Sequence, residues 1–172
     1  MISRIIPGIY SIELSEHELE YVIFNPDECN LILLINPLEV SFVTNIALEL
    51  YSENGCKKLG IVVSYPSPTV VNAVNSLQHL LPSLLTIASS ELSTKLREGK
   101  CTDGPCPPIN VSWEVKGTHV ELDKEIVAIK LNTPIVGALG VLFRGVLLAY
   151  EVRSTPFGTT RYICTSRSCI KQ

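Results

Sequence analysis

Two continuous apolar runs, each followed directly by a predicted helix, constrain the fold of this chain more than any other feature. The runs are "NLILLI" at residues 30–35 and "LGIVVS" at residues 59–64. Both have strand length and show no alternation of polar and apolar residues, which is typical of strands buried on both faces. A strand of this kind needs a layer of structure on each side of its sheet. We therefore predict a layered core of sheet and helices.

The segments after these runs carry signals for helix starts. Asn36 is expected to cap a first helix, with Pro37 in the first helical position. Ser67 is expected to cap a second helix that begins at Pro68. The second helix has apolar residues at spacings of three and four, so one of its faces should pack on the sheet. These two strand–helix units form the centre of the predicted fold.

Strands joined in hairpins are expected on both sides of this centre. Residues 5–35 are typical of a β-meander, and "LLTIAS" is followed by a short helix capped by Ser89 or Ser90. After the loop "CTDGPCPP", strands are expected at "VSWEV", "EIVAIKL", "LGVLF", "VLLAY" and "RYICT". Arg144-Gly145 is expected to form a compact hairpin turn. This order predicts two mixed sheets with helices packed on them.

The composition limits the class of protein. A length of 172 residues favours one domain, and 46% hydrophobic with 18% charged residues is a globular mixture. The net charge of −3 gives no nucleic-acid footprint. No apolar run reaches the length of a membrane span, and the first residues do not resemble a signal peptide. We expect a cytoplasmic protein with no nucleic-acid or membrane partner.

Charge is unevenly distributed along the chain. Residues 13–28 contain acids and no Lys or Arg, whereas residues 152–172 contain Lys and Arg and no acid. The two segments are either solvated edges that attract each other or the two sides of a contact, within the chain or between copies. We divide the chain into a domain over residues 1–151 and a basic, Cys-containing tail over residues 152–172.

Five phrases of the sequence, taken in order, resemble the metallo-β-lactamase superfamily. They are "IIPGIYSIEL", "NLILLINP", "IVVSYPSPTVV", "EIVAIKLNTPIVGALGVL" and "GVLLAYE", and together they run over residues 5–151. The resemblance implies an α+β fold, a four-layer αββα sandwich with two mixed sheets flanked by helices, which is truncated at its C-terminal end. In the family, the loop after the second of the two buried strands binds metal ions through imidazoles and a carboxylate.

The sequence departs from the family at those metal-binding positions. The family's ligands and neighbouring motif residues fall here on Asn36, Tyr65, Ser67, Thr69, Val70, Val136 and Glu151. Zinc needs three or four N, S or O ligands, and this set retains one carboxylate. The resemblance therefore implies a vestigial site without metal or other cofactor, whose side chains we expect to converge near Ser64.

Two hypotheses for function follow. The first is a pseudoenzyme, a non-catalytic interaction or accessory subunit whose partner is a second copy or another protein subunit. An apolar chain that lacks the family's closing helices tends to cover its exposed surface with a partner. The alternative is a hydrolase with a modified, metal-independent site at the strand ends near Ser64 and Glu151.

The cysteines leave several possibilities open. Two pairs share the pattern Cys-Thr-x-x-x-Cys, namely Cys101 with Cys106 and Cys164 with Cys169. They could form disulfides, remain free thiols, or combine as a four-cysteine metal site. The turn sequence between Cys101 and Cys106 makes this pair the better candidate for a disulfide. The other two, Cys29 and Cys56, are expected to be buried thiols.

Overall fold

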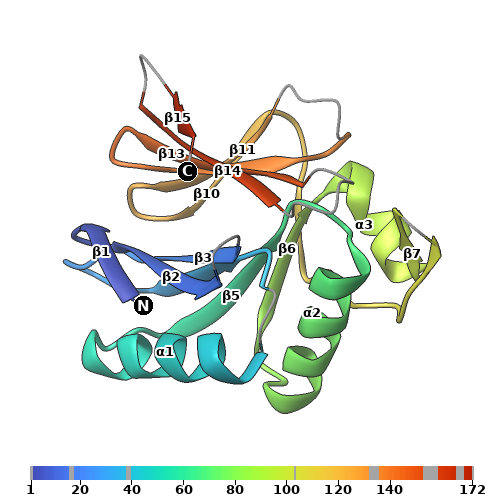
Figure 1. The fold of residues 1–172 in the computed structure, drawn as a ribbon, viewed down its shortest axis with the longest axis horizontal. Coiled ribbons are helices and arrows are strands. Elements are labelled where there is room, and N and C mark those ends of the chain that lie inside the picture. The colour runs from blue at the N-terminus through green and yellow to red at the C-terminus, as the bar shows by residue number, and fades with distance from the viewer. Residues whose placement is uncertain are drawn as a thin grey trace.

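Two β-sheets stack face to face, and helices cover the outer face of the first sheet (Figure 1). The structure is a computed structural model that describes residues 2–15, 18–37, 40–102, 104–131, 136–152, 159–165 and 169–171. The first sheet is built from β1 (Ile2–Ile6), β2 (Ile9–Ser15), β3 (Glu18–Ile23), β4 (Leu31–Ile35), β5 (Lys58–Val63), β6 (Leu85–Ser89) and β9 (Trp113–Val115), in that order. The predicted α+β class, with sheets packed on each other and on helices, is confirmed.

The first sheet is mixed, and its centre is the pair of strands predicted from the apolar runs. Strands β1 to β4 are antiparallel, whereas β4, β5, β6 and β9 run parallel to one another. All five residues of β4 are buried. Full burial on both faces explains why this strand has no polar–apolar alternation.

Three described helices, α1 (Val40–Glu53), α2 (Pro68–Leu80) and α3 (Ser90–Arg97), lie on the side of the first sheet that faces away from the second (Figure 1). The predicted caps of α2 and α3 are confirmed. Ser67 accepts a hydrogen bond from Val70 N, and Ser89 accepts one from Leu92 N. Each serine side chain thus accepts a hydrogen bond from a backbone N–H group in the first turn of the helix. Such N–H groups have no acceptor within the helix.

The second sheet is an antiparallel meander. It consists of β10 (His119–Asp123), β11 (Ile126–Lys130), β12 (Leu139–Phe143), β13 (Val146–Val152), β14 (Thr159–Thr165) and β15 (Cys169–Lys171). The predicted turn between β12 and β13 is confirmed, because Arg144 and Gly145 have φ of 48° and 85°. Strands β14 and β15 lie in the segment expected as a tail and extend this sheet. The domain boundary after residue 151 stays a prediction.

The core has two parts, one on each face of the first sheet. Ile32 and Leu34 of β4 pack among the helices, together with the apolar stripe of α2. Leu33 and Ile35 of the same strand pack between the sheets, against residues such as Phe143. Strand β4 thus belongs to both parts of the core. No described helix is long and apolar enough to cross a membrane.

A cluster of polar contacts joins the two sheets at the amino end of β4. Asp123, at the end of β10, accepts hydrogen bonds from the backbone N atoms of Asn30 and Leu31, each 3.1 Å long. It also accepts one of 3.0 Å from Asn30 Nδ2 and one of 2.8 Å from Lys124 N. Asp123 is buried, with 8% of its surface exposed, so these donors replace the water that a charged group would otherwise hold.

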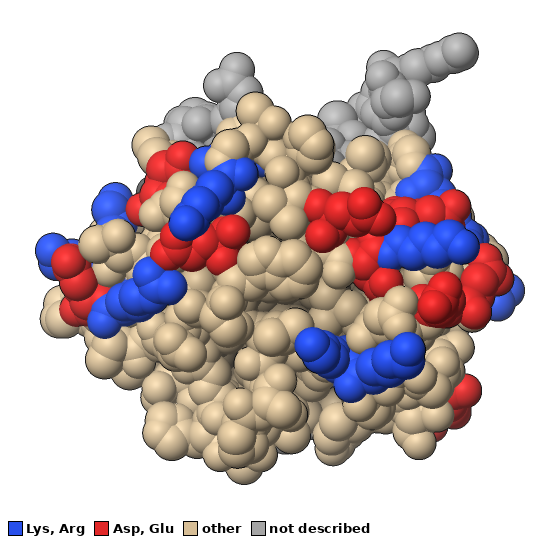
Figure 2. Space-filling view, turned by 180° about the vertical axis from the view of Figure 1, so that it is seen from behind, with Lys and Arg blue, Asp and Glu red and all other residues tan. Residues whose placement is uncertain are grey.

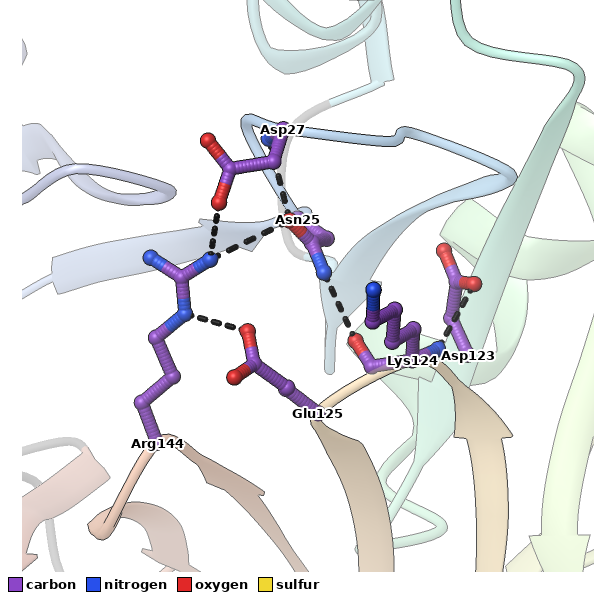
Figure 3. A network of polar contacts seen from close by, with 6 residues as sticks. All are labelled: Asn25, Asp27, Asp123, Lys124, Glu125 and Arg144. Atoms are coloured by element: carbon purple, nitrogen blue, oxygen red, sulfur yellow. Dashed lines mark hydrogen bonds and ion pairs between the residues drawn. The ribbon is translucent and has the colours of Figure 1, made fainter.

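Arg144 extends this junction toward the surface (Figure 3). Its guanidinium donates to Asp27 at 2.6 Å and to Glu125, and a longer contact reaches Asn25. Asn25 Nδ2 in turn donates to Lys124 O at 3.0 Å. Hydrogen bonds to both carboxylates raise the pKa of Arg144 further above its ordinary value, so the group stays charged. The turn between β12 and β13 is therefore tied to the turn that precedes β4.

Two disulfides close loops of different length. The predicted link between Cys101 and Cys106 is confirmed, and it closes the small hairpin of β7 (Lys100–Cys101) and β8 (Gly104–Pro105). The expectation that Cys29 and Cys56 are free thiols is wrong. They form a disulfide with a Cα–Cα distance of 4.6 Å, because the loops that precede the parallel neighbours β4 and β5 lie side by side.

The remaining cysteine pair lies on the last two strands. The backbone register places Cys164 opposite Cys169, and their side chains lie outside the described residues. The four-cysteine metal site is wrong, because two of its proposed members, Cys101 and Cys106, are bonded to each other. A disulfide sulfur lacks the thiolate charge that binds zinc.

Removing the Cys29–Cys56 disulfide should destabilise the protein more than removing Cys101–Cys106. The first link spans 27 residues and the second 5, and a longer closed loop restricts the unfolded chain more. We expect the paired change Cys29→Ala and Cys56→Ala to lower the unfolding free energy by about 2–4 kcal/mol. The matched change at Cys101 and Cys106 should cost about 1–2 kcal/mol less.

Denaturant unfolding of both variants under non-reducing conditions measures the difference. Equal losses, or a larger loss at Cys101 and Cys106, would contradict this account of the two loops.

Candidate functional site

The carboxyl ends of β4 and β5 form the candidate site, because ligands of α/β sheets bind at such strand ends. Asn36 follows β4 with φ of 44°, a left-handed conformation that Asn tolerates better than most residues. Its Oδ1 accepts hydrogen bonds from Ser64 N at 2.7 Å and from Tyr65 N at 3.2 Å. The prediction that Asn36 caps the first helix is wrong, because its side chain pairs with the buried backbone after β5 and α1 begins at Val40.

Asn36 is held through one side of its amide and through its backbone. Its backbone N donates to Val62 O at 2.9 Å, so the residue continues the pairing of β4 with β5. The residue is 1% exposed, and its Nδ2 is buried with no hydrogen-bond partner among the described residues. Asn36 therefore acts as a brace between two strand ends.

Ser64 connects the first sheet to the second. It follows β5, and its side chain is fully buried. Ser64 Oγ accepts a hydrogen bond of 2.8 Å from Leu139 N and donates one of 2.9 Å to Leu139 O. The hydroxyl thus completes both backbone hydrogen bonds of the first residue of β12. The apolar run ends in a serine at the point where the two sheets meet.

This arrangement removes Ser64 from the set of accessible nucleophiles. A catalytic serine needs an exposed hydroxyl and an adjacent base to accept its proton. Here the hydroxyl proton points to a backbone carbonyl, and no described hydrogen bond links Ser64 to an imidazole or a carboxylate. The geometry among the described residues is that of a structural junction.

The other predicted site residues do not converge on one cavity. Tyr65 is 8% exposed, Ser67 caps α2, and Val70 is buried in the core beneath that helix. Thr69 is exposed, and Val136 is 68% exposed on the turn before β12. We expected these side chains to converge near Ser64. Only the side chain of Asn36 and the adjoining backbone of Tyr65 lie there. Glu151 lies on β13, and its side chain is outside the described residues.

Neighbouring loops lie close against these strand ends. Thr102 N, in the disulfide-closed hairpin, donates to Pro66 O at 3.1 Å. Gly137 has φ of 82°, and a Cβ atom there would lie 2.4 Å from Ser89 Oγ. Only glycine permits so close an approach of this turn to the start of α3. The hairpin after α3 thus contacts the loop after β5, and the turn before β12 contacts the start of α3.

An ion pair fastens the second sheet to α3 beside this turn. Lys130 Nζ donates to Glu91 Oε1 at 2.7 Å, and this hydrogen bond lowers the pKa of the Glu91 carboxyl. The pair is partly exposed, and such pairs contribute at most about 1 kcal/mol. It sets the position of α3 relative to β11 more than it stabilises the fold.

The described residues at these strand ends do not fit a catalytic metal. They offer an amide at Asn36, a phenol at Tyr65, hydroxyls at Ser67 and Thr69, and a hydrocarbon at Val70. Zinc is held in proteins by imidazole, thiolate or carboxylate groups. Among the described residues, no group of three or more His, Cys, Asp or Glu could hold a metal ion.

The structure is similar to solved metallo-β-lactamases. A class B3 di-zinc enzyme from an Alaskan soil metagenome matches with a TM-score of 0.60 and 12% identity, over 95% of this chain and 61% of that one. A subclass B3 enzyme from Bradyrhizobium japonicum matches with a TM-score of 0.57 and 15% identity, over the same two shares. A β-lactamase from Chitinophaga pinensis matches with a TM-score of 0.60 and 14% identity, again over those shares.

These matches establish the fold of the chain and confirm the predicted resemblance at that level. No protein-family model and no curated protein matches the sequence. The chain spans 61% of the length of each of the three structures. A shared fold at this identity does not carry over an activity, because unrelated sites are built on one scaffold.

Replacing Ser64 with alanine should destabilise the fold. The change leaves the buried Leu139 N–H and C=O without partners, and each unpaired buried group costs about 1–3 kcal/mol. We expect Ser64→Ala to lower the unfolding free energy by about 2–4 kcal/mol. Ser76→Ala, at an exposed position of α2, should change it by less than about 0.5 kcal/mol.

Chemical denaturation of the two variants beside the parent chain gives both values. If Ser64→Ala is as mild as Ser76→Ala, the hydroxyl does not hold the sheets together.

Proposed function

We propose that this chain is a non-catalytic subunit that uses a metallo-β-lactamase-like fold as a scaffold for association, with a second copy or with another protein. The observation that carries the proposal is the double hydrogen bond between Ser64 Oγ and the backbone of Leu139. It uses the fully buried hydroxyl at the end of β5 to join the sheets. A hydroxyl held in this way stabilises the scaffold and is not free to act as a nucleophile.

The brace at Asn36 supports the same function. The family's carboxylate position holds an amide here, which cannot take or give a proton at physiological pH. Its carbonyl is engaged with Ser64 N and Tyr65 N. Asn36 and Ser64, which follow β4 and β5, therefore both hold backbone groups in place.

A hydrolase with a modified site near Ser64 and Glu151 remains the alternative. It would need Ser64 to break its contacts with Leu139 and gain a base. No contact among the described residues favours that arrangement. We therefore retain the non-catalytic subunit as the proposed function.

The disulfides are relevant to the cellular compartment in which the protein folds. Disulfides are rare in the cytosol of ordinary cells, but they form in oxidising compartments and inside the cells of hyperthermophiles. The chain has two among its described residues. We propose that the protein folds where its cysteines oxidise, and that a cytoplasmic location holds only for a cell that maintains intracellular disulfides.

Metal content and hydrolytic activity test the proposal together. We expect the purified chain, incubated with excess Zn²⁺ and then desalted, to retain less than about 0.1 zinc per chain, because no group of three or more His, Cys, Asp or Glu among the described residues could hold the ion. A chromogenic β-lactam should hydrolyse no faster with the protein than in buffer. Elemental analysis and absorbance measure the two quantities.

One zinc per chain, or turnover above the buffer rate, would contradict the proposal. Ser64→Ala then identifies the source of any turnover. Activity that disappears in Ser64→Ala but persists in Ser76→Ala would establish the hydrolase alternative.

A further inference from the structure

The disulfide between Cys101 and Cys106 lies at the surface, whereas the other described disulfide is enclosed in the core. Cys101 and Cys106 are each partly exposed, and the described residues between them are exposed. Cys29 and Cys56 are each 6% exposed and pack between the first sheet and its helices. Thiol–disulfide exchange begins when a thiolate reaches one sulfur of the bond, so its rate depends on access. The two disulfides should therefore differ in reactivity.

The backbone beside the exposed disulfide is held by contacts that do not involve sulfur. Cys106 N donates a hydrogen bond of 2.9 Å to Gly99 O, and Ile109 N donates one of 3.1 Å to Leu96 O. Ile109 and Leu96 are buried. Gly99 has φ of 74°, and a Cβ atom there would lie 2.6 Å from Cys106 O, so only glycine allows this approach. The chain after the hairpin is thus anchored to α3 by groups other than the S–S bond.

This anchoring keeps the two cysteines together when the bond opens. Cys101 ends β7 and Cys106 directly follows β8, and their sequence separation is 5. Closing so short a loop costs little entropy. Two thiols held near each other react at a high effective concentration. The open form can therefore close again without refolding of the domain.

The hairpin also contacts the loop at the candidate site. Thr102 directly follows Cys101, and its backbone N donates to Pro66 O at 3.1 Å. Pro66 lies between Tyr65, whose backbone N donates to Asn36, and the cap residue of α2. The contact thus links the disulfide to the strand ends. Opening the bond removes the covalent restraint beside Thr102 and should weaken its hydrogen bond to Pro66.

Ion pairs balance the charge beside the hairpin. Lys100 Nζ is 2.8 Å from Glu98 Oε2, and Arg97 donates to Glu114 at 2.6 Å. On the side where Figure 1 places α3 and β7, Figure 2 shows acidic and basic side chains next to one another. Both signs of charge are present, so neither an acidic nor a basic reductant meets a field of one sign. Access to the disulfide therefore depends on exposure more than on charge.

We propose that Cys101–Cys106 is a redox-active disulfide that opens and closes in the folded protein by exchange with a dithiol, while Cys29–Cys56 stays closed. First, a thiolate of the dithiol attacks one sulfur and forms a mixed disulfide, and the other cysteine leaves as a thiolate and takes up a proton. The second thiolate of the dithiol then attacks the dithiol's own sulfur in the mixed disulfide and releases the second cysteine, which is protonated in turn.

The exchange transfers two electrons and two protons to the protein, and the dithiol becomes a disulfide. The same steps in reverse close the bond between Cys101 and Cys106. This inference goes beyond the proposed function and does not depend on it.

Dithiothreitol, an uncharged dithiol, tests the proposal on the folded full chain. The protein is incubated with dithiothreitol without denaturant, samples are alkylated over time, and peptide mapping reports each cysteine. We expect Cys101 and Cys106 to become alkylated at least about tenfold faster than Cys29 and Cys56, because the buried bond is reached only when the chain opens. Circular dichroism should stay unchanged during this reaction. In concentrated guanidinium chloride, where the chain is unfolded, the two rates should become similar.

Two further measurements test reversibility and the link to the strand ends. Oxidised dithiothreitol, added after the reductant is removed, should restore the bond. Reduction should speed hydrogen exchange at Thr102 N at least about tenfold and leave exchange at Ser64 N unchanged. The paired change Cys101→Ala and Cys106→Ala should give the same fast exchange at Thr102 without a reductant.

Equal rates of reduction for the two disulfides in the folded chain would overturn the proposal. Reduction of Cys101–Cys106 only after the circular dichroism of the fold is lost would overturn it too, as would a bond that does not re-form. Exchange at Thr102 that is the same in both states of the bond would overturn the link to the strand ends. These results are separate from metal content and turnover, which test the proposed function.

Discussion

The contact between Ser64 and Leu139 determines what the ends of the strands can do. One hydroxyl supplies both a donor and an acceptor to the first residue of β12, and so joins the two sheets at the carboxyl end of β5. At the opposite end of β4, the carboxylate of Asp123 makes a second junction with the backbone of Asn30 and Leu31. Between these junctions lie the apolar side chains of the core that the two sheets share. The polar groups fix the register of the layers, and the apolar core provides most of the stability.

Much of this fold could be predicted from local patterns. Continuous apolar runs gave the central strands, and Ser67 before Pro68 marked the start of α2 correctly. Asn36 before Pro37 has the same local pattern, yet it braces β5, because contacts between distant segments are invisible to a local signal. The Cys29–Cys56 disulfide escaped prediction for the same reason: its members are far apart in sequence and meet only when β4 and β5 pair in parallel. Cys101 and Cys106 flank a turn, so their proximity could be predicted from the sequence.

The side chains of the predicted site residues have separate roles in the described structure. The resemblance placed seven positions at one cavity, whereas the described structure gives six of them separate roles in a brace, a cap, the core and the surface. The side chain of the seventh, Glu151, lies outside the described residues. The residue that matters most, Ser64, has no distinguishing motif, because a buried serine shows its role only through its partner. Residues 59–90 contain no Asp, Glu, Lys or Arg, and only the structure shows which of them are exposed on α2.

Native-state hydrogen exchange tests the central claim that the strand ends are a structural junction. The backbone N–H groups of Ser64 and Leu139 are bonded to buried side chains, so they should exchange only when the whole domain unfolds. Adding Zn²⁺ should leave their exchange rates unchanged. Fast exchange at Ser64 and Leu139, comparable to that of exposed loops, would show that the junction opens in the native state. Slower exchange there on adding Zn²⁺ would show a metal-binding site and contradict the account.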